Sequence, residues 1–221
     1  MIQEKVCKEN FFRKIPIESI LEIESLALGF GQEKRKEVLA LYSETSRKLI
    51  EGCKDFNNSE KGLYKRLFGF FYYTQEFGAT NEALLMSLSL ISRRFSCYSA
   101  SLLFADVITK LGRPVDLAFT DNHIFIIGEE LAFQTTTGVV NGRNDEVNKF
   151  LGLRCANGDK GRLLSLVYEQ CAGYLSLSLE QVPRIDPSLE SKIDAFLKIS
   201  DSYRGMPCEH SCSDLLKNEK R

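Results

Sequence analysis

The sequence lacks an excess of charge of either sign, since 29 Lys and Arg stand against 30 Asp and Glu, a formal net charge of -1 over 221 residues. This balance gives no general attraction to nucleic acid or to an anionic membrane. No apolar run reaches the roughly 18 residues of a membrane span. The first residues, Met1 to Lys5, lack the apolar core of a signal peptide. We therefore expect a cytoplasmic protein without nucleic-acid or membrane partners.

Cysteine is present in an odd number, seven, at wide spacings. With no signal peptide, this pattern favours reduced thiols over a disulfide framework. Cys208, His210 and Cys212 suggest a metal site, but they lack the CxxC turn of structural zinc sites and an evident fourth ligand. Gly138 and Gly142 lack the lysine and the strand–helix context of a phosphate loop. We expect no metal and no cofactor.

Hydrophobic periodicity predicts a helical N-terminal part. Helices are expected over 17–30, 33–50, 63–73 and 82–92, with Asn81 as the N-cap of the last. The aromatic residues of 63–73 suit a buried helix better than a ligand-stacking surface, because aromatic side chains dominate core burial.

A central helix is predicted to begin at Cys97. Small and apolar residues share one helical face from there on: Cys97, Ala100, Ser101, Phe104, Ile108 and Leu111. Ser96 can cap its start, and Gly112 followed by Pro114 ends it.

The period then changes to two, which predicts strands over 115–119, 123–127 and 131–136. Helices return over 161–178 and 188–199, and the segment after Gly205 is polar. The fold class is therefore α+β, with a cysteine helix packed on a small antiparallel sheet. We expect a core with N-terminal helices over 1–145 and a helical C-terminal extension with a loose tail over 146–221.

The hairpin register follows from its apolar residues. A two-residue loop at Gly128-Glu129 places Ile124 opposite Phe133 and Ile126 opposite Leu131, so that these four share one face. A three-residue loop would scatter them between faces. On the two-residue register, His123 faces Gln134. The Gln134 oxygen then accepts a hydrogen bond from one imidazole nitrogen, which aims the other toward the cysteine helix.

A thiol at a helix N-terminus together with a histidine on a nearby strand is the minimum set for thiol acyl transfer. We expect Cys97 to be the nucleophile, His123 the general acid and base, and Gln134 the residue that orients the ring. Asp121 is a second candidate for the orienting residue, ranked below Gln134. The backbone N–H of Cys97 is one expected oxyanion donor.

The order of these elements resembles the transglutaminase-like branch of the papain-type thiol enzymes. The resemblance covers about 70–140 and rests on four segments: Cys97-Tyr98-Ser99-Ala100-Ser101-Leu102-Leu103-Phe104, Leu111-Gly112-Arg113-Pro114-Val115, His123-Ile124-Phe125-Ile126 and Phe133-Gln134-Thr135-Thr136. It is most similar to the bacterial branch in which this core precedes tetratricopeptide-like helices, for which Leu163 to Pro187 resembles one helical hairpin. The chain departs from the family at Gln134, where an acid is usual, and at Phe95 and Ser96, where Gly and Asn are common.

The resemblance implies a thiol hydrolase or acyltransferase that acts on an amide bond in a protein or peptide, as a peptidase, deamidase or cross-linker. Two other classes stay open. An inactive member of the family would serve as a protein-binding module, which Gln134 at the acid position makes credible. A helical adaptor would bind a protein partner through 150–221.

Overall fold

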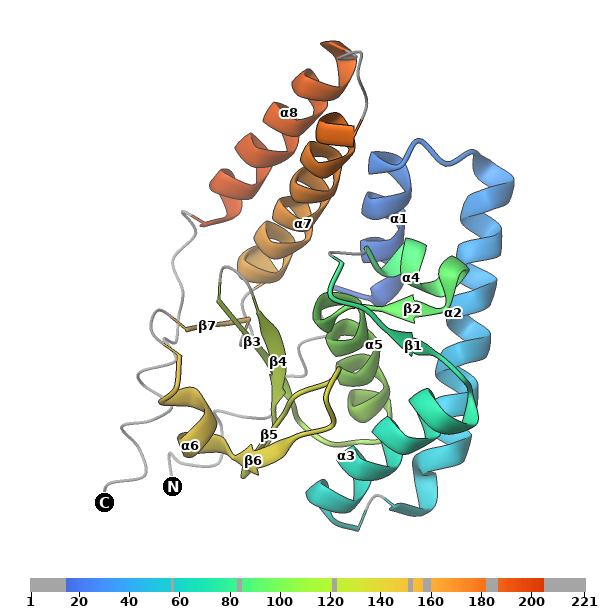
Figure 1. The fold of residues 1–221 in the computed structure, drawn as a ribbon, viewed down its shortest axis with the longest axis vertical. Helices are drawn as coiled ribbons and strands as arrows, with labels where there is room; N and C mark the ends of the chain where they lie inside the picture. Colours follow the sequence, from blue (N-terminus) through green and yellow to red (C-terminus); the bar gives the residue numbers. More distant parts are fainter. Residues whose placement is uncertain are drawn as a thin grey trace.

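The computed structural model describes residues 15–56, 58–82, 85–120, 123–150, 153–156, 160–181 and 187–204. Within these ranges the chain is an α+β protein, in which helices flank a small antiparallel sheet (Figure 1). The predicted fold class is therefore confirmed at the level of α+β.

The helices follow the predicted order closely. They are α1 (Ile17–Ala27), α2 (Gln32–Cys53), α3 (Glu60–Gly69), α4 (Met86–Ser92), α5 (Cys97–Lys110), α6 (Arg143–Val147), α7 (Lys160–Gln181) and α8 (Pro187–Arg204). A π-helical turn, Phe70–Thr74, extends α3. The aromatic segment 63–73 is thus helical as predicted, with Tyr64 and Phe71 fully buried.

Helix α4 begins later than predicted, because its cap is not local. Its N-cap position is Leu85, whose side chain makes no capping hydrogen bond. Instead the buried carboxylate of Glu24 in α1 accepts hydrogen bonds from the backbone N–H groups of Met86 and Ser87, at 3.2 and 2.7 Å. Asn81 is not the cap, and the expectation that it would be is wrong.

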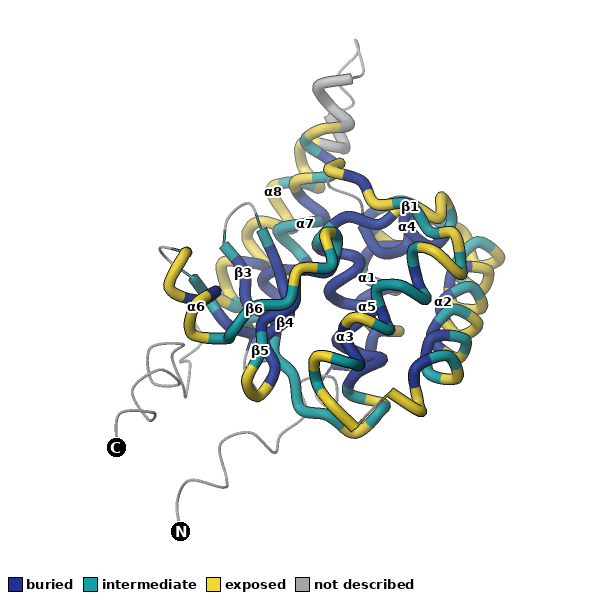
Figure 2. Tube along the Cα trace, turned by 60° about the horizontal axis from the view of Figure 1, so that its bottom comes forward, coloured by how far each residue is buried: buried dark blue, intermediate teal, exposed yellow. Residues whose placement is uncertain are grey.

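Helix α5 occupies the centre of the molecule (Figure 1). It contacts strand β4 on one side and helices α2 and α4 on the other. From Tyr98 to Ile108 every side chain is buried (Figure 2), as a helix covered on all sides requires. The buried Phe104 ring stacks on Phe133 of the sheet at 5.8 Å and meets Phe71 edge-on at 4.9 Å.

The main sheet has the strand order β6-β5-β4-β3-β7, and all its neighbouring strands are antiparallel. Its strands are β3 (Asp116–Phe119), β4 (Ile124–Ile127), β5 (Leu131–Phe133), β6 (Val140–Gly142) and β7 (Arg154–Cys155). Sequence reasoning missed β6 and β7. It also missed the short parallel pair of β1 (Gly78–Ala79) and β2 (Arg94–Phe95), which ends just before Cys97.

The β4–β5 hairpin has the predicted faces but not the predicted register. Ile126 pairs with Phe133 and Ile127 with Ala132, so the pairing is shifted by two residues from the expected one. The two-residue loop is Glu129-Glu130, closed by the hydrogen bond from Gly128 N to Leu131 O at 2.8 Å. Because a shift of two preserves the alternation of side chains, the same apolar residues still face α5.

Gly128 stands where α3 approaches the hairpin, and this contact explains the glycine. A Cβ there would overlap the carboxylate of Glu60 and the hydroxyl of Tyr64. Tyr64 is fully buried and stacks on Phe133 at 5.0 Å, so it cannot easily move away. The Glu60 carboxylate accepts from the hydroxyl of Tyr64 at 2.7 Å and from the N–H of Glu130 at 3.1 Å.

We therefore expect Gly128→Ala to lower the free energy of unfolding by about 1–3 kcal/mol, the range typical of overpacking. Gly69→Ala is the matched control, since a Cβ at Gly69 meets nothing within 4 Å inside α3. In a helix interior that exchange should raise stability by about 0.5–1 kcal/mol. Urea denaturation of both variants measures the difference, and an equal effect of the two would contradict this account of the hairpin.

The C-terminal helices α7 and α8 form a helical hairpin that stands out from the sheet (Figure 1). The expectation of a hairpin within Leu163 to Pro187 is wrong, because the single helix α7 covers most of that range. Helix α7 also contacts α1, and its buried side chains from Leu163 to Cys171 belong to the main hydrophobic core. The division into a core over 1–145 and an extension over 146–221 stays a prediction. Among the described helices, none combines the length and the apolar character that crossing a bilayer requires.

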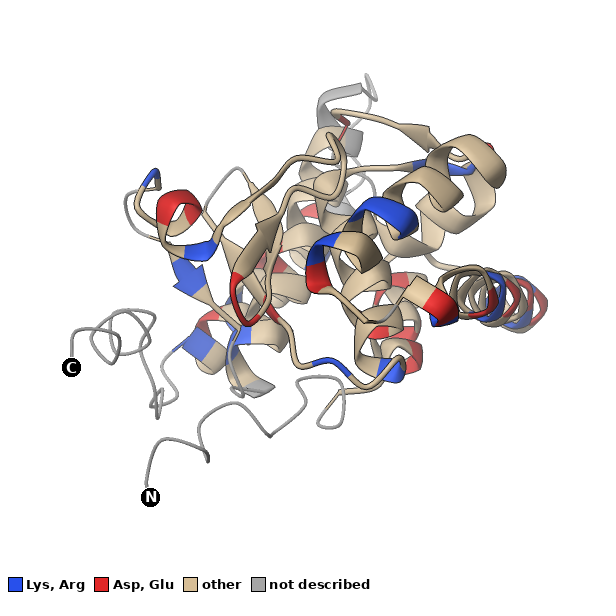
Figure 3. Ribbon diagram, turned by 90° about the horizontal axis from the view of Figure 1, so that it is seen from below, with Lys and Arg blue, Asp and Glu red and all other residues tan. Residues whose placement is uncertain are grey.

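The charges of α2 are of mixed sign along its exposed face (Figure 3). Ion pairs within the helix join Lys34 to Glu37, Lys36 to Glu33, Arg47 to Glu51 and Lys48 to Glu44, at 2.6–3.0 Å. This face is therefore a solvated helix surface rather than a basic contact patch.

Candidate functional site

The nucleophile candidate lies at the first residue of α5, as predicted. Ser96 is the N-cap, and its hydroxyl accepts from the N–H of Ser99 while the hydroxyl of Ser99 accepts from the N–H of Ser96. This capping box fixes where the helix starts. It therefore holds Cys97 at the positive end of the helix dipole, where a thiolate is stabilised.

His123 and Gln134 are hydrogen bonded, Nε2 of the ring to Oε1 of the amide. The predicted contact is confirmed, but the predicted reason is wrong. In the observed register the two residues are diagonal rather than directly opposite, since Ile126 pairs with Phe133. Diagonal positions lie about 7–8 Å apart, within reach of side chains of this length.

Cys97 and His123 line one cavity and lie close enough for a hydrogen bond between the sulfur and the ring to shift the pKa of both groups. Burial raises the pKa of the Cys97 thiol, but the bond to His123 and the backbone N–H groups of Ile124 and Tyr98 outweigh it and hold that pKa below its usual value. The same bond to Cys97 raises the pKa of His123, against the opposing effect of burial, with a smaller contribution from Gln134. Both shifts favour a thiolate–imidazolium pair near neutral pH.

The histidine ring is held by its neighbours as well as by its hydrogen bonds. Phe125 and Phe150 lie beside it, with ring centroids at 5.8 and 5.7 Å. One turn along α5 from Cys97, the hydroxyl of Ser101 bonds to Ile124 O at 3.4 Å and to the hydroxyl of Thr135 at 2.9 Å. Ser101 thus ties the helix to the residues that follow both His123 and Gln134.

Cys97 and His123 open into a cavity of about 550 Å³. Its other described lining residues are uncharged: Thr80, Asn81, Ser96, Tyr98, Phe119, Thr120, Ile124, Thr136, Thr137, Leu166 and Gln170. Asn81 reaches this cavity because β1 pairs with β2, which leads into Ser96 and Cys97. Its amide is a side-chain candidate for the oxyanion donor that sequence reasoning left unassigned.

Glu146 is the site residue that sequence reasoning missed. It lies in the five-residue helix α6 and is only 4% exposed. Its Oε1 accepts from Nε2 of Gln134 at 2.7 Å, and its Oε2 accepts from Nδ2 of Asn141 at 2.6 Å and from Nζ of Lys149 at 2.7 Å. The only local signal is a glutamate three residues before a lysine, which is common on solvated helices.

The other candidates fall into two groups. Asp121, Cys208, His210 and Cys212 lie outside the described residues. Cys53 and Cys171 are free thiols in the core, and burial raises the pKa of both, that of Cys53 to about 11. Cys155 is disulfide-bonded, so the expectation of reduced cysteines is wrong for this residue. In the described ranges no cluster of three or more His, Cys, Asp or Glu could hold a metal ion.

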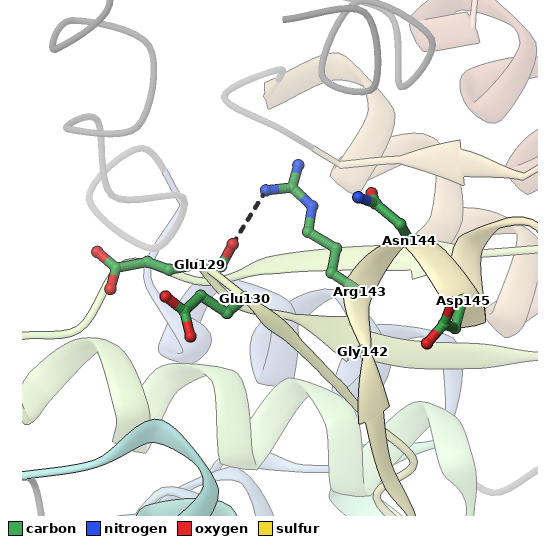
Figure 4. Close-up of a pocket in the computed structure, with 6 residues that line it drawn as sticks. All are labelled: Glu129, Glu130, Gly142, Arg143, Asn144 and Asp145. Atoms are coloured by element: carbon green, nitrogen blue, oxygen red, sulfur yellow. Dashed lines mark hydrogen bonds between the residues drawn. The ribbon is translucent and has the colours of Figure 1, made fainter. Parts of the chain in front are cut away.

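A second pocket of about 320 Å³ lies at the far end of the hairpin, between its turn and α6 (Figure 4). Glu129, Glu130, Arg143, Asn144 and Asp145 line it together with Gly142, and the Arg143 guanidinium donates to the backbone oxygen of Glu129 at 3.5 Å. These residues include neither a thiol nor an imidazole.

No family model, no curated protein and no solved structure matches this chain.

Proposed function

We propose that this protein is a transglutaminase-like thiol hydrolase or acyltransferase that acts on an amide bond of a protein or peptide. The observation that carries the proposal is the arrangement of Cys97, His123 and Gln134: the thiol and the ring share a cavity, and the ring is hydrogen bonded to the amide. Thiol, imidazole and amide in this order form a Cys-His-amide site of the papain type.

In the first half of the reaction, the Cys97 sulfur attacks the carbonyl carbon and a carbon–sulfur bond forms. The negative charge moves to the carbonyl oxygen, where the N–H of Cys97 can stabilise it. The His123 imidazolium gives its proton to the amide nitrogen. The carbon–nitrogen bond then breaks, the amine leaves, and a thioester to Cys97 remains.

In the second half, water or an amine attacks the thioester while His123 removes its proton. The carbon–sulfur bond breaks and the thiolate returns. Water as the acceptor gives a carboxylic acid, so the enzyme is a hydrolase or deamidase, whereas an amine gives a new amide and makes it a cross-linker. The described cavity residues are uncharged apart from the reacting pair, which suits a neutral carboxamide or peptide bond.

The proposal is tested by treating the folded protein with iodoacetamide at pH 6.5 and mapping the alkylated cysteine by mass spectrometry. An ordinary thiol with a pKa of about 8.5 is only about 1% thiolate at this pH. We expect Cys97 to react at least about tenfold faster than glutathione, and Cys53 and Cys171 to stay unlabelled because they are buried.

Turnover is then measured as ammonia released from an N-acylated glutaminylglycine, with hydroxylamine as the competing acceptor. Cys97→Ala should abolish it. A Cys97 that reacts no faster than glutathione would leave a protein-binding module as the better description. If partner binding survived in Cys97→Ala and was lost on truncation after Gly142, an adaptor role for the C-terminal helices would be favoured.

A further inference from the structure

The hydrogen-bonded series does not end at Gln134. The amide of Gln134 lies between the His123 ring and the Glu146 carboxylate, accepting from the first and donating to the second at 2.7 Å. Gln134 is 8% exposed and Glu146 is 4% exposed. A buried carboxylate therefore stands one amide away from the imidazole, in a site whose third residue is not an acid.

We propose that Glu146 is the acidic member of this site and acts on His123 through the Gln134 amide. Glu146 would be a positioning residue, since it touches neither the thiol nor the cavity. The inference rests on the proposed function, because it assigns a role in the same reaction. It answers why a thiol site can work with Gln134 where a carboxylate is usual.

Glu146 removes an ambiguity that a glutamine alone would leave. An amide can present either its oxygen or its NH₂ group to a histidine, and the two ends have nearly the same shape. An ionised carboxylate can only accept, so the NH₂ group must face Glu146 and the oxygen must face the ring. His123 then carries its proton on Nε2, which leaves Nδ1 for the sulfur of Cys97.

The carboxylate is held ionised. Burial raises the pKa of Glu146, but the hydrogen bonds from Lys149, Asn141 and Gln134 outweigh it and leave that pKa below its usual value. The side chain of Lys149 is 55% exposed and that of Glu146 only 6%. Solvent therefore screens the ammonium more than the carboxylate, and a negative potential persists at the amide. That potential is one of the influences that raise the pKa of His123.

The competing explanation is structural: Glu146 fastens α6 to the sheet and does nothing to the ring. Loss of a structural clamp lowers stability but leaves the pH dependence of the folded protein unchanged. An electrostatic and orienting role changes the pH dependence of Cys97. The two explanations are separated by the acid limb of the alkylation profile, which is the pH range in which the rate at Cys97 falls as the thiolate is protonated.

The experiment compares iodoacetamide rates at Cys97 from pH 5 to pH 9 in the full-length protein and its variants. Glu146→Gln keeps an acceptor for Gln134 but removes the charge. It also lets both side-chain amides flip, so that the oxygen and the NH₂ group can exchange places. We expect about fivefold slower alkylation at pH 6, with the acid limb shifted to higher pH, in line with tenfold per pKa unit. Asp145→Asn is the matched control: it removes a charge from the same helix at an exposed residue of the second pocket (Figure 4), and its rate should not change.

The double variant Gln134→Glu with Glu146→Gln exchanges amide and acid, and should restore the wild-type rate at pH 6 to within about twofold. Lys149→Met changes no buried side chain but removes the strongest of the hydrogen bonds that hold the pKa of Glu146 down. The carboxyl should then lose its charge more readily as pH falls, and alkylation at pH 5.5 should slow by about twofold. It keeps the inference testable if Glu146→Gln does not fold.

The outcomes separate the two proposals. An unreactive Cys97 in the wild-type protein would overturn the proposed function. A reactive wild-type Cys97 whose profile is the same in Glu146→Gln and Asp145→Asn would overturn the role of Glu146 alone. That role is equally overturned if Glu146→Gln does not fold and Lys149→Met has no effect on the acid limb.

Discussion

Replacing His123 with alanine is expected to slow alkylation of Cys97 at pH 6.5 by about 30-fold or more. In the wild-type protein, burial raises the pKa of the thiol and the bond to His123 is the largest of the effects that lower it. Without the ring the largest of the lowering effects is lost, so the pKa of the thiol is expected to rise. The acid limb then moves to higher pH, and less thiolate is present at every pH below it.

The loss should be smaller than the change in thiolate fraction, because a more basic thiolate is also a better nucleophile. At a pH above the thiol pKa of both proteins, the two rates should converge. The measurement is the second-order rate at Cys97 against pH. Thr137→Ala, at another residue that lines the cavity, is the control and should keep the wild-type profile. Equal profiles for His123→Ala and wild type would mean that the ring does not activate the sulfur.

The beginning of α5 could be predicted because the information is local. Ser96 and Ser99 form a capping box within four residues, and the apolar spacing beyond Cys97 gives the buried helix. The placement of the thiol at a helix N-terminus follows directly from these residues. The contact of His123 with Gln134 also follows, since alternation restricts which side chains share a face.

The register of that hairpin could not be predicted, because a glycine at position 128 can indicate either a turn or a close contact with another element. A glycine after a strand is a turn signal, so the sequence predicts the loop at Gly128-Glu129. In the structure the glycine is needed because Glu60 and Tyr64 of α3 lie against it. The two-residue loop begins one residue later than predicted. This contact between α3 and the hairpin joins segments more than sixty residues apart, so no local sequence pattern indicates it.

Glu146 and Glu24 escape sequence reasoning for the same reason. Each is a buried carboxylate with a partner in another element of the chain, and each lies near charged residues that look like solvated helix surface. Hydrophobic periodicity finds the core, but it assigns every glutamate to the surface. These two buried acids are therefore recognisable only once the elements are packed together.

Glu24→Ala is expected to lower the free energy of unfolding by about 3–5 kcal/mol, because each buried donor left without an acceptor costs about 1–3 kcal/mol. Glu24 is fully buried and accepts from Met86 N, from Ser87 N and Oγ, and from the hydroxyl of Tyr98, at 2.7–3.2 Å. Alanine leaves two N–H groups of α4 and two hydroxyls without this acceptor. Urea denaturation followed by circular dichroism measures the loss.

Glu22→Ala in the same helix is the matched control, because Glu22 is exposed and its loss should change stability by no more than about 0.5 kcal/mol.

Burial raises the pKa of Glu24 above its unfolded value, against the hydrogen bonds from Ser87, Met86 and Tyr98. The stability that this carboxyl contributes is thus complete below the unfolded pKa and declines as pH rises toward the folded pKa. The advantage of wild type over Glu24→Gln should accordingly be larger at pH 4 than at pH 8. Since Tyr98 follows Cys97 directly, Glu24→Ala should also slow alkylation of Cys97 in the protein that remains folded, and an unchanged rate would show that the α5 N-terminus is positioned without this network.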